Sequence, residues 1–392
     1  MLSVLESKCH LDALDQLAHA DRLLSAVEDI GVTAPCRIAD LSLPVMQELV
    51  GDPLGLTLSA MNTADAHAGM TDRCRWTLEW SGEGAEKAPR GLFAKATPPS
   101  AAHREMLAVL HMDQAEVRFY NEVAPELGDL VPRCFHASSF GGGRSLVLLE
   151  DIEQTGCVPY WQGYDCTPEH ARAVAVALAR IHAQFWQSER LGTDLSWIRP
   201  RPRRYGVNWL LSAHDGVRTT FLGNPPREHV SATALAALEV WHECSRAVID
   251  YWQTLPATVL HGDSHLGNTF SRPDGSAGYF DWQVTFSGPG LRDLSYFLMS
   301  ALTNEQRQEH ERSIFETYVD VLKDHGVAVD QQQLWDEYVL FAFDRFDATI
   351  MAWVHGTYNH APEGQLRMFR TISGAIEDNG VPDRLKRLRS RL

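Results

Sequence analysis

The sequence predicts an α+β protein with a small antiparallel sheet in its N-terminal part and a large, mainly helical C-terminal part. Three short segments with strand character precede residue 100, separated by loops rich in Gly, Asp and Ala. Beyond about residue 167, apolar residues instead recur every three or four positions, as on one face of a helix. The 392 residues exceed the usual size of one domain, so we expect more than one core. The predicted parts are a helical N-terminal extension, a small lobe and a large helical lobe, over residues 1–54, 55–152 and 153–392.

The N-terminal extension and the small lobe carry distinct local signals. Leu14, Leu17 and Leu24 have helical spacing, and a Pro- and Gly-marked break follows at residues 52–55. The expected strands are 55–61, 74–80, 91–97 and 145–151. In the third strand, the two-residue alternation places Lys95 on the same face as Phe93, so the lysine projects from a half-buried strand. A helix over about 102–123 is expected next.

The large lobe begins with a clear helix signal. Thr167 is a suitable N-cap, Pro168 occupies the first helical position, and Val174, Leu178 and Ile181 then recur at helical spacing. Further helices are expected at about 231–254, 290–302, 304–325 and 331–355. Short strands are expected near 258–260, 269–271 and 278–281.

Composition and charge restrict the classes of partner. A formal net charge of −16 disfavours binding to nucleic acid or to an anionic membrane surface. The seven cysteines are scattered without a Cys-x-x-Cys pair, which is typical of a reducing cytoplasm. The sequence shows neither a secretory signal pattern nor an apolar run long enough to cross a bilayer. We expect a soluble cytoplasmic monomer or homodimer that binds a small molecule.

The residues with the clearest chemistry follow the predicted strand at 258–260. Asp263 and Asn268 lie five residues apart in a loop with apolar flanks. In phosphoryl transfer, one carboxylate orients the attacking hydroxyl and accepts its proton, while an amide oxygen helps to hold magnesium. Asp281, at the end of the next predicted strands, is placed to supply the carboxylate ligand of the metal. This pattern predicts a phosphotransferase site.

Charge on the phosphates that stay with the nucleotide also needs a cation. Lys95 can supply it if a carboxylate fixes its long side chain. Glu116 on the following helix is the candidate, because Phe119 and Tyr120 give that face apolar packing. Glu105 is the weaker alternative.

These motifs together resemble a known superfamily. The pattern His-Gly-Asp-x-His-x-Gly-Asn, followed by an aspartate that ends a strand, is similar to the signature of aminoglycoside phosphotransferases and choline kinases. The lysine strand, the Glu-x-x-Phe-Tyr helix, the Leu-Glu-Asp hinge and the Gly-Pro-Gly-Leu-Arg-Asp-Leu-Ser-Tyr-Phe segment look most like its ecdysteroid-kinase-like branch, which has bacterial members. The resemblance covers roughly residues 55–355 and implies a protein-kinase-like two-lobe fold that uses ATP and Mg²⁺.

The resemblance also implies a role for individual residues. Asp263 would be the catalytic base, Asn268 and Asp281 the magnesium ligands, and Lys95 with Glu116 the phosphate-positioning pair. Backbone groups would bind adenine at Glu150, Asp151 and Ile152. His261 would brace the loop and Asp293 would hold its backbone, and we interpret His265 as a further hydrogen-bonding residue of the loop.

Two features depart from protein kinases. The loop expected to cover the phosphates contains a single glycine, which weakens the case for a nest of backbone donors there. Its residues are Gly69, Met70 and Thr71. Asp281 is followed by Trp282 and Gln283 where protein kinases have Phe-Gly, so a switchable activation segment is not expected.

Two other classes of function compete with a kinase. His261, Asp263 and His265 alternate as the ligands of a metal-dependent phosphoesterase can. That reading leaves Lys95 and Glu116 without a role. A nucleotide-binding pseudokinase scaffold is the other alternative, although none of the motifs is degraded.

The acceptor is the least determined part of the prediction. A cationic acceptor of the aminoglycoside or choline type needs carboxylates or an aromatic cage. Asp344 and Asp347 are the only suggestive pair, and their neighbours are mostly apolar or aromatic. We therefore expect a largely hydrophobic alcohol, such as a steroid, terpenoid or hydroxyacyl compound. Tyr160, Trp161 and Trp209 are further candidates for the pocket, and Trp209 lies in a stretch that we expect to be irregular. An anionic acceptor is an alternative, because four arginines lie close together in the sequence: Arg199, Arg201, Arg203 and Arg204.

Overall fold

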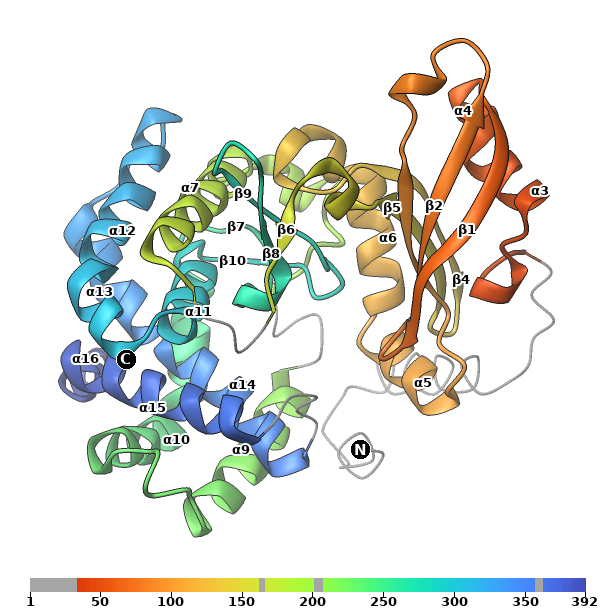
Figure 1. The fold of residues 1–392 in the computed structure, drawn as a ribbon. Coiled ribbons are helices and arrows are strands. Elements are labelled where there is room, and N and C mark those ends of the chain that lie inside the picture. The colour runs from red at the N-terminus through yellow and green to blue at the C-terminus, as the bar shows by residue number, and fades with distance from the viewer. Residues whose placement is uncertain (1–33, 162–165, 201–206, 357–361) are drawn as a thin grey trace. The chain divides into compact units, whose positions relative to one another are not determined.

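The computed structural model describes residues 34–161, 166–200, 207–356 and 362–392, without the side chains of residues 207–213 and 362 (Figure 1). The described residues form two compact units, which we call the sheet unit and the helical unit. The sheet unit comprises 34–159 and Gly278–Thr285, and the helical unit comprises Tyr160–Ala277 and Phe286–Leu392. Asp281 is therefore grouped with the N-terminal strands, although it follows the Asp263 motif in sequence.

Short helices begin the described part of the sheet unit. The prediction of a helical extension over 1–54 falls outside the described residues up to residue 33. The helices that follow are η1 (Ile38–Asp40), α3 (Leu43–Met46), the π-helix η2 (Gln47–Gly51) and α4 (Asp52–Leu54). Gly55 ends them in a left-handed conformation at φ 68°, which a glycine adopts without strain.

An antiparallel sheet forms the centre of this unit, as predicted, and it has five strands where four were expected. Its strand order is β1-β2-β3-β5-β4. The strands are β1 (Thr57–Ala68), β2 (Asp72–Ser81), β3 (Gly91–Ala96), β4 (Cys134–Gly141) and β5 (Arg144–Glu150). The strand β1 is longer than predicted and the edge strand β4 was not predicted. Most residues of β1 are exposed and those of β4 are mostly half-buried, and neither strand shows the apolar alternation on which the prediction relied.

The two faces of β3 have different neighbours. Leu92 and Ala94 belong to the apolar core that also contains Met46 and Val50 of the N-terminal helices. Lys95 lies on the opposite face because side chains alternate along a strand. In the sheet it stands opposite Arg73 of β2 and Val147 of β5.

The helix predicted over 102–123 is two helices, α5 (Ala101–Val109) and α6 (Met112–Glu122). His111 separates them in a left-handed conformation at φ 54°, which interrupts the helical hydrogen bonding. The helix α6 packs on β4 and β5 and buries Phe119 and Tyr120. Short elements complete the unit: η3 (Ala85–Lys87), η4 (Ala124–Glu126), η5 (Gly128–Leu130), η6 (Ile152–Thr155) and β6 (Val158–Pro159).

The helical unit confirms the other half of the predicted fold class. Its first helix begins as predicted, with the Thr167 hydroxyl accepting a hydrogen bond from the backbone N–H of His170 at 3.1 Å and Pro168 at the first position. The helices are α7 (Pro168–Gln184), η7 (Glu189–Gly192), α9 (Val207–Gly223), α10 (Ala232–Trp252), η8 (Leu266–Asn268), α11 (Leu291–Ala301), α12 (Asn304–Asp324), α13 (Gln331–Leu340), α14 (Ala342–His355), α15 (Pro362–Asp378) and α16 (Val381–Arg389). The strands are β7 (Thr258–Leu260), β8 (Thr269–Ser271) and β10 (Phe286–Gly288), and β10 pairs antiparallel with β7. The strand β9 (Ala277–Tyr279) begins at the last residue of Tyr160–Ala277 and continues into the segment of the sheet unit.

Three helical predictions need correction. The stretch around Trp209 was expected to be irregular, but Trp209 lies in α9. The single helix expected over 331–355 is α13 and α14, which meet at Phe341. The helices α15 and α16 were not predicted.

The helix α11 is at the centre of the helical unit. All of its residues except Ser300 are buried, and it contacts α7, α12, α13, α14 and α15. It is therefore a rigid support for the polar side chains that it carries, Arg292, Asp293 and Tyr296. Among the helices of the described residues, none combines the length and apolarity that a membrane span requires.

A buried ion pair joins α9 to α14. Arg218 donates from Nε to Asp347 at 2.7 Å, and the indole of Trp241 donates to the same carboxylate at 2.9 Å. Burial would raise the pKa of Asp347, but the charge and hydrogen bond of Arg218 outweigh it and lower the pKa.

We expect Asp347→Asn to lower the free energy of unfolding by about 3–5 kcal/mol, because it leaves the buried Arg218 without its counter-charge. Urea unfolding measures this loss. The matched control is Glu316→Gln, which breaks the exposed pair with Arg312 and should cost much less. Equal losses in the two variants would contradict this assignment.

Candidate active site

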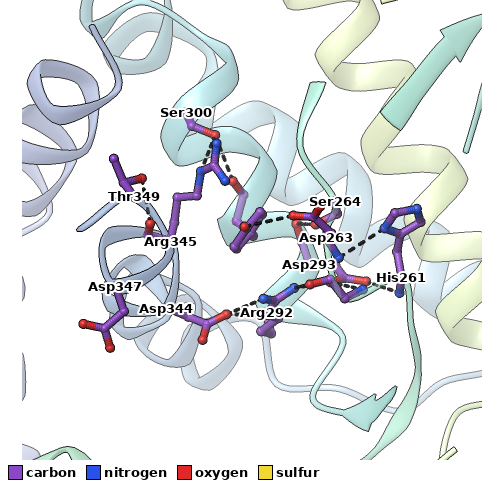
Figure 2. A network of polar contacts seen from close by, with 12 residues as sticks. His261, Asp263, Ser264, Arg292, Asp293, Ser300, Asp344, Arg345, Asp347 and Thr349 are labelled. Carbon is purple, nitrogen blue, oxygen red and sulfur yellow. Dashed lines mark hydrogen bonds and ion pairs between the residues drawn. The ribbon is translucent and has the colours of Figure 1, made fainter. Parts of the chain in front are cut away.

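The loop from His261 to Asn268, called the Asp263 loop below, is held by one buried carboxylate. Asp293 on α11 accepts the backbone N–H of His261 at 2.6 Å and that of Gly262 at 3.2 Å. The hydroxyl of Ser264 donates to the backbone oxygen of Asp293 at 2.7 Å. Gly262 has φ 86°, a conformation that favours glycine, so its place in the motif has a backbone cause. Figure 2 shows these contacts converging on Asp293.

The electrostatics of Asp293 fit this supporting role. Burial alone would raise the pKa of the Asp293 carboxyl, but the nearby His182, whose Nε2 lies 3.7 Å from Oδ2, and the charge of Arg292 lower it to about 2. The carboxylate is thus ionised at any pH near neutrality and can accept both backbone donors. His261 is fully buried and its Nδ1 accepts the backbone N–H of Asp263 at 3.2 Å. Both residues thus contact the backbone of the Asp263 loop, and their supporting roles stay a prediction.

Asp263 itself is oriented but accessible. Its Oδ1 accepts the hydroxyl of Tyr296 at 3.0 Å, and Nε2 of His265 lies 3.4 Å from its Oδ2. About 37% of the side chain is exposed, so a substrate can reach it. Burial would raise the pKa of this carboxyl, but His265, Arg345 and His261 lower it instead. Asp263 is therefore an ionised carboxylate that can accept a hydrogen bond from a hydroxyl group.

Asn268 presents its amide oxygen. Its Nδ2 donates to the backbone oxygen of Asp263 at 2.9 Å, which fixes the orientation of the amide. Within the described part of the chain, no hydrogen bond is donated to its Oδ1. An amide oxygen is a ligand type that Mg²⁺ accepts.

The sheet unit contains a second constellation, which we call the Lys95 cluster: Lys95, Glu116 and Asp281. Nζ of Lys95 lies 2.8 Å from the carboxylate of Glu116 and 3.0 Å from Oδ1 of Asp281. Lys95 and Glu116 are each 5% exposed, so this charge-assisted contact is shielded from solvent. The predicted partner Glu116 is the one that the structure places beside the lysine, and Glu105 is not in the cluster.

Asp281 is fixed by its backbone and by its neighbour. It has φ 67°, in the left-handed region that aspartate tolerates better than most residues. The ring of Trp282 stacks on Phe119 of α6 at 3.9 Å with an interplanar angle of 6°. The helix α6 thus positions Glu116 directly and Asp281 through the Trp282 ring. Arg73, whose Nη2 lies 4.0 Å from Oδ2 of Asp281, is a further cation that the sequence analysis missed.

The residues predicted to contact the nucleotide lie at two other places in the sheet unit. Gly69, Met70 and Thr71 form the turn between β1 and β2, where the Gly69 N–H donates to the Thr71 oxygen at 2.9 Å. A Cβ at Gly69 would meet no atom within 4 Å, so packing does not require glycine there.

The predicted adenine-binding segment ends β5. The N–H groups of Glu150 and Asp151 donate to the oxygens of Arg133 and Gly91 at 2.8 and 3.2 Å. These two donors are therefore engaged within the fold. The Asp151 carboxylate forms an ion pair with Arg75 at 2.9 Å, and Ile152 begins η6. An adenine contact by any of these backbone groups stays a prediction.

The candidate acceptor residues are dispersed. Tyr160 stacks on His170 at 3.8 Å, and its N–H donates to the oxygen of Thr269 at 3.0 Å, so it lies beside the strand that follows the Asp263 loop. Trp161 is 54% exposed. Trp209 lies in α9 and its side chain is outside the described set.

Asp344 and Asp347 line a cavity of about 90 Å³, together with Trp241, Trp252, Phe286 and Phe341. Both carboxylates have internal partners. Asp344 accepts Nε of Arg292 at 2.6 Å, and Asp347 is bound by Arg218. The cavity is therefore lined by aromatic rings and neutralised acids, and neither acid offers an unpaired charge to a cationic acceptor.

Three residues around the Asp263 loop were missed by sequence reasoning. Arg292 donates from Nη1 to the Gly262 oxygen at 2.6 Å and joins Asp344 to Asp293 (Figure 2). Its guanidinium lies 4.3 Å from the ring of Tyr296, and that of Arg345 lies 4.4 Å from the same ring. The one available signal was that Arg292 and Tyr296 are four residues apart in a segment already singled out for Asp293.

Groups of three or more His, Cys, Asp or Glu side chains arranged to hold a metal are absent from the residues that the structure describes. His261, Asp263 and His265 form no such group. The oxygen donors expected for Mg²⁺, Asn268 Oδ1 and the Asp281 carboxylate, fit that ion by chemical type.

We expect Asp293→Asn to change how stability depends on acid. Since the pKa of Asp293 is lowered in the folded state, its contribution of about 2 kcal/mol is present above the unfolded pKa of about 4 and is lost as pH falls toward about 2. The variant should lack this part of the acid dependence. Urea unfolding between roughly pH 5 and pH 2.5 measures it, and identical profiles for the two proteins would contradict it.

Comparison with known proteins identifies the family of this chain. The model of the Ecdysteroid kinase-like family matches residues 67–189 and 214–330, which together are more than half of the chain. A search of curated proteins finds no match.

Solved structures with some likeness to this chain include two bacterial enzymes and one from a parasite. The aminoglycoside phosphotransferase of Alicyclobacillus acidocaldarius is 15% identical over 84% of this chain and 93% of its own, with a TM-score of 0.45. The choline kinase LicA of Streptococcus pneumoniae is 13% identical over 85% and 98%, with a TM-score of 0.45. The Plasmodium vivax ethanolamine kinase is 12% identical over 86% and 88%, also at 0.45. At these values the likenesses carry no argument about activity. The family match covers Lys95, Glu116, Asp263, Asn268 and Asp281, and the chain belongs to the Ecdysteroid kinase-like family.

Proposed function

We propose that this protein is a small-molecule kinase that transfers the γ-phosphate of ATP to a hydroxyl group of its acceptor. The observation that carries the proposal is the Asp263 loop, in which an accessible carboxylate and an amide oxygen of fixed orientation are held by one buried support. Phosphoryl transfer needs these two groups. The family match supports the same class of reaction.

Each of these side chains has a role in the proposed phosphoryl transfer. Asp263 orients the acceptor hydroxyl and accepts its proton as the oxygen bonds to phosphorus and the bond from phosphorus to ADP breaks. Lys95, fixed by Glu116, neutralises charge on the phosphates that stay with ADP. Asn268 and Asp281 would hold Mg²⁺, which supplies further charge neutralisation on the phosphates when bound.

For the acceptor, we propose a largely hydrophobic alcohol such as a steroid, terpenoid or hydroxyacyl compound. Two observations support this choice over an aminoglycoside or choline-type acceptor. Asp344 and Asp347 are bound by buried arginines, so they offer no unpaired negative charge. The cavity that these acids line also contains the aromatic rings of Trp241, Trp252 and Phe341, which favours an apolar acceptor.

We expect Asp263→Asn to lower turnover by at least about 100-fold while ATP affinity stays within about twofold, because general base and orienting effects are lost but the nucleotide contacts are not. Turnover is measured as ADP release with magnesium, and affinity by calorimetry. Nucleotide binding without any ADP release by the wild-type protein would favour the pseudokinase. Hydrolysis of phosphate esters without ATP, by protein that contains zinc, would favour the phosphoesterase.

The acceptor class is tested by a panel of compounds under the same conditions. Hydroxylated steroids, terpenoid alcohols and hydroxyacyl thioesters should raise ADP release above the rate with water alone, whereas choline and aminoglycosides should not. Each positive compound must yield a phosphate ester by mass spectrometry. Stimulation by the cationic compounds alone would refute the proposed acceptor class and leave the kinase assignment intact.

A further inference from the structure

The two oxygens of the Asp263 carboxylate have unequal surroundings. Oδ1 accepts a hydrogen bond of 3.0 Å from the hydroxyl of Tyr296. Oδ2 has Nε2 of His265 at 3.4 Å, which is longer than an ordinary hydrogen bond of this type. We propose that Tyr296 is a positioning residue that fixes Asp263 through Oδ1 and leaves Oδ2 to accept the proton of the acceptor. The inference rests on the kinase function proposed above.

The hydroxyl of Tyr296 is held in place by its own surroundings. The side chain is buried, at 4% exposure, on the central helix α11. The guanidinium groups of Arg292 and Arg345 lie 4.3 and 4.4 Å from the centre of its ring, the range of attractive cation–π contacts. A hydroxyl on a ring fixed in this way can determine the rotation of the Asp263 side chain.

Both guanidinium groups are themselves anchored. Arg292 is bound by the carboxylates of Asp344 and Asp293 at 2.6 and 3.0 Å. Arg345 donates from Nε to the hydroxyl of Ser300 at 3.1 Å and from Nη2 to the sulfur of Met368 at 3.0 Å. Figure 2 shows Arg292 and Arg345 reaching this region from α11 and α14. The position of Tyr296 is thus set by two helices.

The helix α11 therefore holds both the backbone next to Asp263 and the side chain of Asp263. Asp293 of α11 binds the backbone of the loop at His261 and Gly262, and Tyr296, three residues later, binds the side chain of Asp263. With backbone and side chain held by the same rigid element, the carboxylate needs little reorganisation when a substrate arrives. Such preorganisation lowers the barrier of the chemical step rather than the dissociation constant of the nucleotide.

In the proposed step, Oδ2 of Asp263 is the oxygen that accepts the proton. When the acceptor oxygen bonds to phosphorus, its O–H bond breaks, the bond from phosphorus to the leaving oxygen of ADP breaks, and Asp263 Oδ2 takes the proton. Tyr296 keeps its own proton, which stays in the hydrogen bond to Oδ1. Burial and the charge of Asp263 raise the pKa of Tyr296 to about 12, so the phenol remains a donor throughout the range of an enzyme assay.

The test compares Tyr296→Phe with Tyr338→Phe. The control removes a similar bond, from the buried hydroxyl of Tyr338 to Oε1 of Glu311 at 2.7 Å, on the same helical unit but away from the Asp263 loop. We expect Tyr296→Phe to lower kcat for ADP release by about 10- to 100-fold with KM for ATP within about twofold. Tyr338→Phe should change thermal stability without moving kcat or KM.

The results for the Asp263 and Tyr296 variants distinguish a failure of the positioning role from a failure of the kinase function. If Asp263→Asn abolishes ADP release while Tyr296→Phe retains wild-type kcat, the positioning role is overturned and the kinase assignment stands. If Asp263→Asn leaves ADP release unchanged, the proposed function itself fails. Should Tyr296→Phe not fold, Arg345→Met keeps the phenol but removes one contact to its ring, and it should shift kcat in the same direction; an unchanged kcat would then overturn the positioning role.

Discussion

The candidate site depends most on two hydrogen bonds to the carboxylate of Asp293. The backbone N–H groups of His261 and Gly262 donate them. A fully buried carboxylate is stable only if its oxygens are satisfied, and here two N–H groups and Arg292 satisfy them. The carboxylate and the loop backbone each constrain the other. The carboxylate fixes the backbone immediately before Asp263, and that backbone must in turn adopt the conformation at Gly262 that lets both amides point at one side chain.

The Lys95 cluster follows the same principle with different elements. Lys95 projects from the middle of a sheet, and Glu116 and Phe119 lie one helical turn apart on α6. Phe119 stacks on Trp282, and the adjacent Asp281 is within 3.0 Å of the lysine. An apolar contact thus helps to position a charged one. Each unit holds its polar groups in advance on rigid elements, which is how electrostatic catalysis avoids reorganisation during the reaction.

Much of this arrangement could be predicted from the sequence, because local pattern and motif order determine it. Alternation along β3 predicts the face of Lys95, and the helical face shared with Phe119 and Tyr120 predicts Glu116 as its partner. Other features depend on tertiary contacts that leave no local signal. The left-handed His111 that separates α5 from α6 lies inside an uninterrupted helical pattern. Arg292 and Asp344, 52 residues apart, are neighbours only because α11 packs on α14.

The proposed reaction moves a phosphoryl group from ATP to an alcohol by means of Asp263. The most direct measurement follows ATP by ³¹P NMR in the presence of magnesium and the best compound of the acceptor panel, with wild-type protein and with Asp263→Asn. We expect a phosphate monoester signal that grows in step with ADP for the wild type and is absent for the variant. Inorganic phosphate as the sole product, or an equal ester signal from both proteins, would contradict it.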